Sequence, residues 1–209
     1  MSETLKTDIT KTDEQQMVSD PLTLHTEDGL VLKQYTTPED DVAYMDIQDR
    51  NREHIAEFGN KIYTAEEATE ARLNPNGIIR MGIWKKDKLI GEISVTSLDS
   101  GEAETGIWLA KDATGQGYAT SALNTVTKYA NSRFSRVVAE IDVKNEKSID
   151  LYKRVGYYLT GRTVERSWSN EPALVFEFPQ NLDQQSLTSA PFLQPRSANY
   201  YPGSPPIYP

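Results

Sequence analysis

The sequence predicts a mixed α/β (α+β) domain whose central sheet is mostly antiparallel, with one parallel pair of strands around a crossover helix. Short strand-like runs separated by tight turns fill residues 78–109, which is typical of antiparallel strands. Further on, a long helical period lies between two strand-like runs, and a right-handed crossover makes such strands parallel. The 209 residues include no cysteine, which excludes disulfides, thiolate metal sites and a cysteine nucleophile.

The composition divides the chain into one domain and two terminal segments. Residues 1–20 contain two basic and five acidic residues and few large apolar ones, so we expect an acidic disordered segment. Residues 180–209 hold six of the 11 prolines and predict a disordered tail rich in Pro and Tyr. The remaining residues, 21–179, carry −6 of the net charge of −9 and are enough for one compact domain.

The first half of the domain predicts a hairpin, two helices and three antiparallel strands. A Glu-Asp-Gly turn at 27–29 separates two extended runs, and apolar residues then recur at helical spacing up to an Asn-Pro pair. The expected strands cover 22–24, 30–35, 78–85, 88–98 and 102–109, and the expected helices cover 38–58 and 65–73.

The second half alternates helices and strands. Buried-face spacing predicts an amphipathic helix over 117–134. A second helix over 146–155 has Asn145 as a candidate N-cap and Gly156 as its stop. The expected strands cover 137–143, 157–168 and 174–178, so that the order, with the first hairpin counted once, is β-α-α-β-β-β-α-β-α-β-β.

A glycine-containing loop, Lys111-Asp-Ala-Thr-Gly-Gln-Gly-Tyr-Ala-Thr120, opens the first of these two helices. Two glycines at a helix N-terminus allow consecutive backbone N–H groups to converge on an anion, and the helix dipole adds to the attraction. The loop lacks the Gly-Lys-Ser/Thr of a P-loop, and Thr120 stands where a dinucleotide fingerprint has its third glycine. The alternative interpretation is an ordinary tight turn.

The loop and the order of elements resemble the GNAT superfamily of acetyl-CoA-dependent N-acetyltransferases over nearly all of residues 21–179. In that family an Arg/Gln-x-x-Gly-x-Gly/Ala loop holds the pyrophosphate of acetyl-CoA, and Gly115 and Gly117 match this pattern. Asp112 stands where the family has Arg or Gln, so we expect a weaker CoA site. The resemblance implies CoA contacts at Ile107, Leu109, Thr114, Gly115, Gln116, Gly117, Tyr118, Ala119 and Thr120, and a thioester carbonyl polarised by backbone N–H groups of residues 107–110.

A second and more specific likeness lies in residues 145–157, which resemble the family's Asn-x-x-Ser/Ala-x-x-Leu-Tyr-x-x-x-Gly-Phe segment. It implies that Asn145 and Ser148 contact the cofactor and that the Tyr152 hydroxyl protonates the leaving thiolate. A positioned acid with a pKa near 10 suits that step. The alternatives are a simple N-cap for Asn145 and a core aromatic for Tyr152.

Direct acetyl transfer to a primary amine through a tetrahedral intermediate also needs a base, because a protonated amine cannot attack a thioester. Glu104 is the first candidate, since related acetyltransferases often place a carboxylate on this strand. Glu102 and Glu92 are substitutes, and a solvated strand face is the alternative for each carboxylate. Two distant histidines and no cysteine predict no metal site.

Residues 49–55, 89–93, 104–110 and 115–123 resemble the branch of the superfamily that acetylates the N-terminal amine of ribosomal proteins, some members of which modify other amines. In such relatives the segment 51–58 borders the acceptor, which makes His54 a minor candidate against the alternative of a surface histidine. The negative charge argues against a nucleic-acid partner and favours a cationic acceptor. Lys111, Lys144 and Lys147 flank the expected CoA side.

The tail and the termini add weaker expectations. Pro205-Pro206-Ile207-Tyr208 fits the ligand pattern of WW domains and Pro202-Gly-Ser-Pro205 fits a Pro-x-x-Pro ligand of SH3 type, although a plain disordered extension is the alternative. No apolar run suits a membrane span or an export signal, so we expect a cytoplasmic protein. The competing functions are a non-catalytic CoA- or peptide-binding module and an adaptor that acts through the tail.

Overall fold

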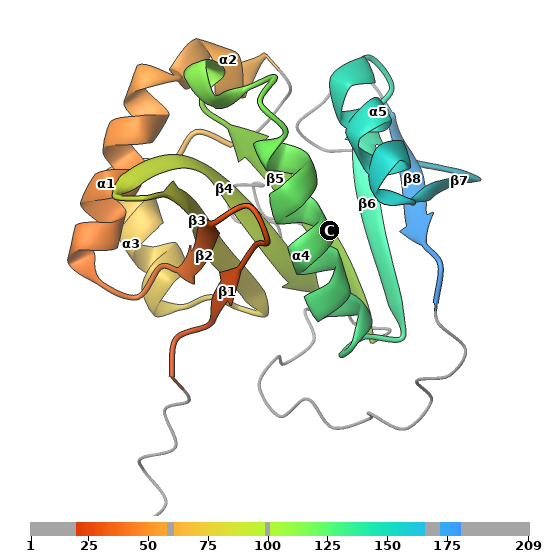
Figure 1. Ribbon diagram of the computed structural model, residues 1–209, viewed down its shortest axis with the longest axis horizontal. Coiled ribbons are helices and arrows are strands. Elements are labelled where there is room, and N and C mark those ends of the chain that lie inside the picture. Colours follow the sequence, from red (N-terminus) through yellow and green to blue (C-terminus); the bar gives the residue numbers. More distant parts are fainter. Residues whose placement is uncertain (1–19, 58–60, 99–100, 166–171, 181–209) are drawn as a thin grey trace, which may run out of the picture.

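The structure, a computed structural model, describes residues 20–57, 61–98, 101–165 and 172–180. Its centre is one eight-stranded sheet in the order β1-β2-β3-β4-β5-β6-β8-β7 (Figure 1). The strands are β1 (Thr23–His25), β2 (Leu30–Gln34), β3 (Ile78–Lys85), β4 (Lys88–Ser97), β5 (Glu102–Leu109), β6 (Arg136–Asp142), β7 (Tyr158–Val164) and β8 (Ala173–Phe178). Only β5 and β6 pair in parallel, which confirms the predicted mixed sheet.

The helices begin and end largely where capping residues predict. They are α1 (Pro38–Arg50), α2 (Arg52–Ala56), α3 (Ala65–Leu73), the short 3₁₀ helix η1 (Lys111–Ala113), α4 (Tyr118–Asn131) and α5 (Glu146–Val155). Capping boxes at Thr37 and Thr64 start α1 and α3. The single helix expected over 38–58 is divided at Asn51, which ends α1 and precedes α2.

The helices cover the two faces of the sheet, as side chains on β5 show. The Thr105 hydroxyl meets the hydroxyls of Tyr152, on α5, and Tyr157. The ring of Trp108, which has the opposite strand parity, packs edge-on against Tyr44 of α1 at 6.3 Å between centroids. The Tyr157 hydroxyl also meets that of Thr127 on α4. Helices α4 and α5 therefore lie on one face, and α1 lies on the other.

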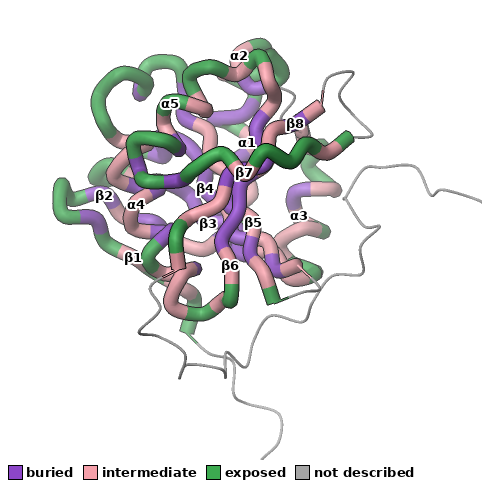
Figure 2. The backbone as a smooth tube through the Cα atoms, turned by 90° about the vertical axis from the view of Figure 1, so that its right-hand side faces the viewer, coloured by how far each residue is buried: buried purple, intermediate pink, exposed green. Residues whose placement is uncertain are grey.

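The buried core follows the middle strands. Figure 2 shows buried backbone running along β6, whereas the outer strand β7 is mostly exposed. Strands β3 and β4 each contain a run of five buried residues. Helix α4 adds Ala122, Leu123, Val126 and Ala130, all at 0% exposure, to this core. Their spacing of one, three and four residues is the buried face expected from the sequence.

The sheet opens between its two parallel strands. Backbone pairing of β5 with β6 covers only residues 102–104 against 136–138, and beyond this point β6 pairs with β8 while β5 stays with β4. The Ala110 N–H bonds the Ile90 carbonyl of β4, so alternation along the strand directs the N–H groups of Ile107 and Leu109 away from β4. We call this opening the fork.

Some expectations lie outside the described residues. These are the acidic segment before residue 20, the helix end at Phe58, the strand end at 166–168, and the tail after residue 180 with its Pro-Pro-Ile-Tyr pattern. Of the helices in the described part of the chain, none has both the length and the apolarity required to cross a bilayer.

Candidate active site

The glycine loop before α4 presents a row of backbone N–H groups. Gly115 and Gly117 have φ of 74° and 85°, which glycine adopts without strain. Gly117 is the N-cap of α4, and no side chain caps this helix. Among the described residues none supplies a carbonyl to the N–H groups of residues 115–120, so these six donors are available to an anion. We call residues 115–120 the cradle.

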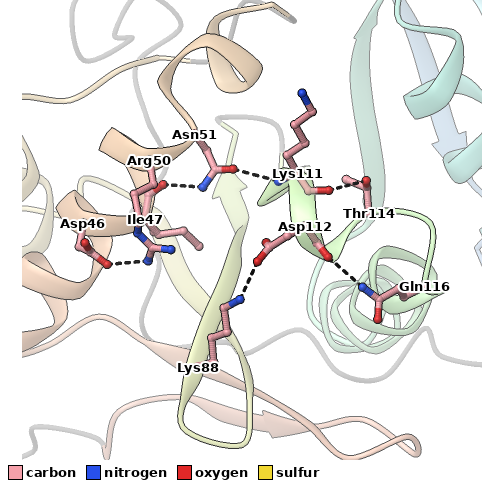
Figure 3. A network of polar contacts seen from close by, with 9 residues as sticks. All are labelled: Asp46, Ile47, Arg50, Asn51, Lys88, Lys111, Asp112, Thr114 and Gln116. Carbon is pink, nitrogen blue, oxygen red and sulfur yellow. Dashed lines mark hydrogen bonds and ion pairs between the residues drawn. The ribbon is translucent and has the colours of Figure 1, made fainter.

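Short polar contacts hold the cradle from outside and from within (Figure 3). The Thr114 hydroxyl donates to the Lys111 carbonyl at 2.8 Å, and the Gln116 side chain donates to the Asp112 carbonyl at 2.9 Å. From the other side, Asn51 Oδ1 accepts from the Lys111 N–H at 2.9 Å. Three side-chain contacts therefore restrain the loop.

Asp112, which departs from the family pattern, turns its carboxylate to the β3–β4 hairpin. It forms an ion pair with Lys88 at 2.6 Å, as Figure 3 shows. The hydrogen bond from Lys88 lowers the pKa of this carboxyl, so the group is ionised at neutral pH and partly neutralised by its partner. Both side chains are more than half exposed, so the pair stabilises the fold only modestly.

Further basic side chains lie at the start of α4. Lys85 stacks over the Tyr118 ring at 4.4 Å and hydrogen-bonds its hydroxyl, and Arg154 reaches the Thr120 hydroxyl at 3.4 Å. Sequence reasoning missed these side chains and Lys88, because only the folded β3–β4 hairpin and α5 bring them to the cradle.

Tyr152 lies at the point where the fork opens. Its hydroxyl donates to the Thr105 carbonyl at 2.8 Å, one residue beyond the last paired residue of β5. The side chain is 2% exposed, and its ring packs edge-on against Tyr157 at 4.9 Å. Tyr152 is thus both a core aromatic and a hydroxyl beside the open strand edge, so the two alternatives are not exclusive.

A chain of buried hydroxyls continues from Tyr152. The Thr105 hydroxyl lies 3.5 Å from that of Tyr152 and 3.2 Å from that of Tyr157, which lies 2.9 Å from Thr127 on α4. Burial raises the pKa of Tyr157, and its hydroxyl contacts oppose the shift. The family segment has Phe where this chain has Tyr157, and the sequence does not indicate that the extra hydroxyl would join this chain of contacts.

The three candidate bases differ in their surroundings. Glu102 pairs with Arg136, which also binds Glu177, so it belongs to a structural ion-pair bridge. Glu104 is half-buried on the last rung that joins β5 to β6, and its strand parity places it on the face opposite Tyr152. Glu104 and Tyr152 thus approach the fork from opposite faces of the sheet.

Glu92 forms a buried ion pair with Arg80 at 2.6 Å, where the two side chains are 11% and 9% exposed. The Arg80 guanidinium also lies 4.6 Å and 4.5 Å from the ring centroids of Tyr44 and Tyr63. Burial alone would lower the pKa of Arg80, but the Glu92 carboxylate together with Tyr44 and Tyr63 raises it. Glu92 is therefore the counter-ion of Arg80 in the buried layer between the sheet and α1.

Two further candidates have local roles. Asn145 Oδ1 accepts from the Ser148 N–H at 3.0 Å and caps α5, which leaves Nδ2 as the group that could reach a ligand. His54 Nδ1 lies 3.8 Å from the Glu57 carboxylate on the same helical turn. Both contacts are local interactions within the protein.

Comparison with known proteins agrees with this geometry. The family description "Acetyltransferase (GNAT) domain" matches residues 28–158. A Bacillus subtilis (strain 168) protein, "Putative ribosomal N-acetyltransferase YdaF", is 33% identical over 99 residues, which are 46% of this chain and 54% of the relative. The chain thus spans about half the length of this curated relative.

Two solved structures share the fold. The ribosomal L7/L12 α-N-protein acetyltransferase RimL in complex with coenzyme A has a TM-score of 0.67 and 15% identity, covering 76% of this chain and 98% of its own. Spermidine N-acetyltransferase from Vibrio cholerae, in complex with CoA and spermine, has a TM-score of 0.60 and 20% identity, covering 71% and 94%. At such identities the structures establish the fold alone, while the family match spans well over half of the sequence. The chain belongs to the GNAT family of acetyltransferases.

Proposed function

We propose that this protein transfers the acetyl group of acetyl-CoA directly to a primary amine. The observation that carries the proposal is the place of the Tyr152 hydroxyl, which lies at the fork on the same face of the sheet as α4. An open strand edge runs from that hydroxyl toward the cradle. The cradle suits a phosphate group, the open edge of β5 suits an extended amide chain, and the Tyr152 hydroxyl suits a reacting thioester.

The cradle would hold the pyrophosphate of CoA through the N–H groups of residues 115–120, next to Thr114. The pantetheine amides would then pair with the open edge of β5 at the Ile107 carbonyl and the Leu109 N–H, as an added strand does. Asn145 Nδ2 and Ser148 would contact the arm from α5. The basic side chains Lys85 and Lys88 would offset the negative charge of the domain near the phosphates.

The chemistry assigns one proton transfer to each face of β5. Glu104, through a water molecule, would take a proton from the incoming ammonium, and the free amine would form the new C–N bond. The Ile107 N–H would stabilise the oxyanion of the tetrahedral intermediate, because the Ala110 N–H bonds the Ile90 carbonyl and alternation turns the Trp108 N–H to the same side. The nitrogen of the tetrahedral intermediate would release its second proton to water. When the C–S bond breaks, Tyr152 would give its proton to the sulfur and later regain one from solvent.

The acceptor would be a cationic amine, either a peptide N-terminus or a polyamine. The relatives named above act on a ribosomal protein and on spermidine, and a net charge of −9 attracts either class. A panel of peptides with Ser, Ala or Met at the first position, beside spermidine and spermine, separates the two classes by kcat/KM.

The test follows the release of free thiol from acetyl-CoA with a thiol reagent. Because the chain has no cysteine, the protein itself contributes no signal to this assay. Release that depends on an amine from the panel supports the proposal. CoA binding by calorimetry without release above spontaneous hydrolysis would instead identify a non-catalytic CoA-binding module, and the enzyme interpretation would be wrong.

Two expectations remain part of the proposal. The Pro-Pro-Ile-Tyr pattern at residues 205–208 would bind a WW-type domain, which titration of a tail peptide with such a domain can measure. The enzyme would act in the cytoplasm, and cell fractionation followed by immunoblotting can check this location.

A further inference from the structure

Asn51 occupies the junction of α1 and α2, at the start of the segment 51–58 that borders the acceptor in relatives. An asparagine before a helix usually caps that helix with its own side chain. Asn51 does not cap α2. Its Oδ1 instead accepts from the Lys111 N–H, 60 residues further along the chain, at 2.9 Å (Figure 3).

The other half of the same carboxamide is bound to α1. The backbone N–H of Asn51 bonds the Gln48 carbonyl, three residues back, so it does not serve the Ile47 carbonyl as a regular helix would. Asn51 Nδ2 donates to this Ile47 carbonyl at 2.8 Å. One side chain therefore joins the last turn of α1 to the first residue of η1.

The carboxamide makes both contacts at once, one with its N–H donor and one with its oxygen acceptor. An aspartate at this position keeps an acceptor for the Lys111 N–H but has no donor for the Ile47 carbonyl, and an alanine has neither. The link continues from Lys111 into the loop, because the Lys111 carbonyl accepts from Thr114, next to Gly115 of the cradle. Four residues thus separate the side chain of Asn51 from the cradle glycine.

We propose that Asn51 is a positioning residue that couples the cradle to the α1–α2 junction. The inference rests on the proposed function, because it requires that CoA phosphates bind the cradle. A phosphate there restrains Lys111, and the carboxamide passes the restraint to Ile47 and to the first turn of α2. By linkage, CoA and a ligand that orders the α1–α2 junction each raise the protein's affinity for the other by the same factor.

Hydrogen exchange with and without CoA tests the coupling. In the natural protein, CoA should slow exchange in the loop and in peptides covering residues 47–57, whose Ile55 and Glu57 N–H groups bond within α2. In Asn51→Ala, CoA should still slow the loop but leave 47–57 unchanged, and its dissociation constant should rise roughly three- to tenfold, the usual worth of one hydrogen bond. If Asn51 had a merely structural role, its replacement by alanine would speed exchange in the free protein, and CoA would still slow exchange in residues 47–57.

Two further variants sharpen the test. Asn74→Ala removes a matched asparagine at the end of α3, whose side chain donates to Glu70 of its own helix, and should behave as the natural protein. Asn51→Asp should keep CoA affinity within about threefold but lose the slowing at 47–57, and it serves if the alanine variant does not fold. The coupling is overturned if CoA slows exchange at residues 47–57 as much in either Asn51 variant as in the natural protein. It is also overturned if CoA binds the natural protein and protects the loop but does not slow exchange at residues 47–57. A failure of CoA to bind the natural protein overturns the proposed function itself.

Discussion

Replacing Tyr152 by Phe removes one hydroxyl from the fork and leaves the ring in place. The hydroxyl makes one good hydrogen bond, 2.8 Å to the Thr105 carbonyl, so its loss should cost about 1–2 kcal/mol of unfolding free energy, including the buried carbonyl left without this donor. A domain with about 5–15 kcal/mol to lose stays folded. If Tyr152 protonates the thiolate, kcat should fall about 10²- to 10³-fold, since positioned acids contribute factors of this order.

The assay combines thiol release under saturating acetyl-CoA with calorimetric titration of CoA. The CoA dissociation constant should stay within about threefold, because the hydroxyl acts on the leaving group and not on the phosphates. Tyr157→Phe is the matched control, since it removes a neighbouring buried hydroxyl, 2.9 Å from Thr127, at a similar cost in stability. A kcat for Tyr152→Phe no lower than that of the control would refute the acid role and leave Tyr152 with a packing role alone.

Four other changes test separate parts of the structure. Asp112→Asn should tighten CoA binding about two- to fivefold in low salt and not in high salt, since it removes a charge near the phosphates; calorimetry showing weaker binding would contradict this. Glu92→Gln should cost about 3–5 kcal/mol in urea unfolding because it strands the buried Arg80, and a loss below about 1 kcal/mol would contradict the buried pair. Burial would raise the pKa of Asp40, but the N–H groups of Thr36 and Thr37 together with Lys33 lower it, so its contribution to stability is present above about pH 4 and disappears as pH falls further. Urea unfolding should show Asp40→Asn less stable than the natural protein at pH 7 and equally stable in acid, and a difference that is constant with pH would be inconsistent. Deleting residues 181–209 should leave kcat and KM within about twofold, whereas loss of thiol release would make the tail part of the enzyme.

The sequence predicts those features of the site that depend on neighbouring residues. Gly115 and Gly117 were expected to form a cradle, and the structure gives both the positive φ that such a loop requires. Asn145 was a candidate N-cap and is one. In each case the deciding interaction lies within a few residues, where spacing alone carries the information.

Features that depend on distant partners could not be predicted. The sequence made Glu104 the first candidate, with Glu102 and Glu92 as substitutes. It could not show the ion-pair partners of the substitutes, because Arg136 lies 34 residues from Glu102 and Arg80 lies 12 from Glu92. The bond from Asn51 to the start of the loop spans 60 residues. Nothing in the strand itself marks where its pairing with the next strand ends, so the fork was not predicted although the parallel pair was.

The fork divides the single sheet into two parts that are joined only at one end of β5 and β6. Three backbone rungs join the five-stranded part, β1–β5, to the three-stranded part, β6–β8. An interior strand with an unpaired edge normally invites another chain to pair with it, and here α4 and α5 cover one face of the opening. An extended amide ligand that fills the edge replaces the missing rungs and ties the two parts together. Acetyl-CoA would then be a temporary strand of the sheet as well as a substrate, and its departure after each turnover would return the domain to its two-part state.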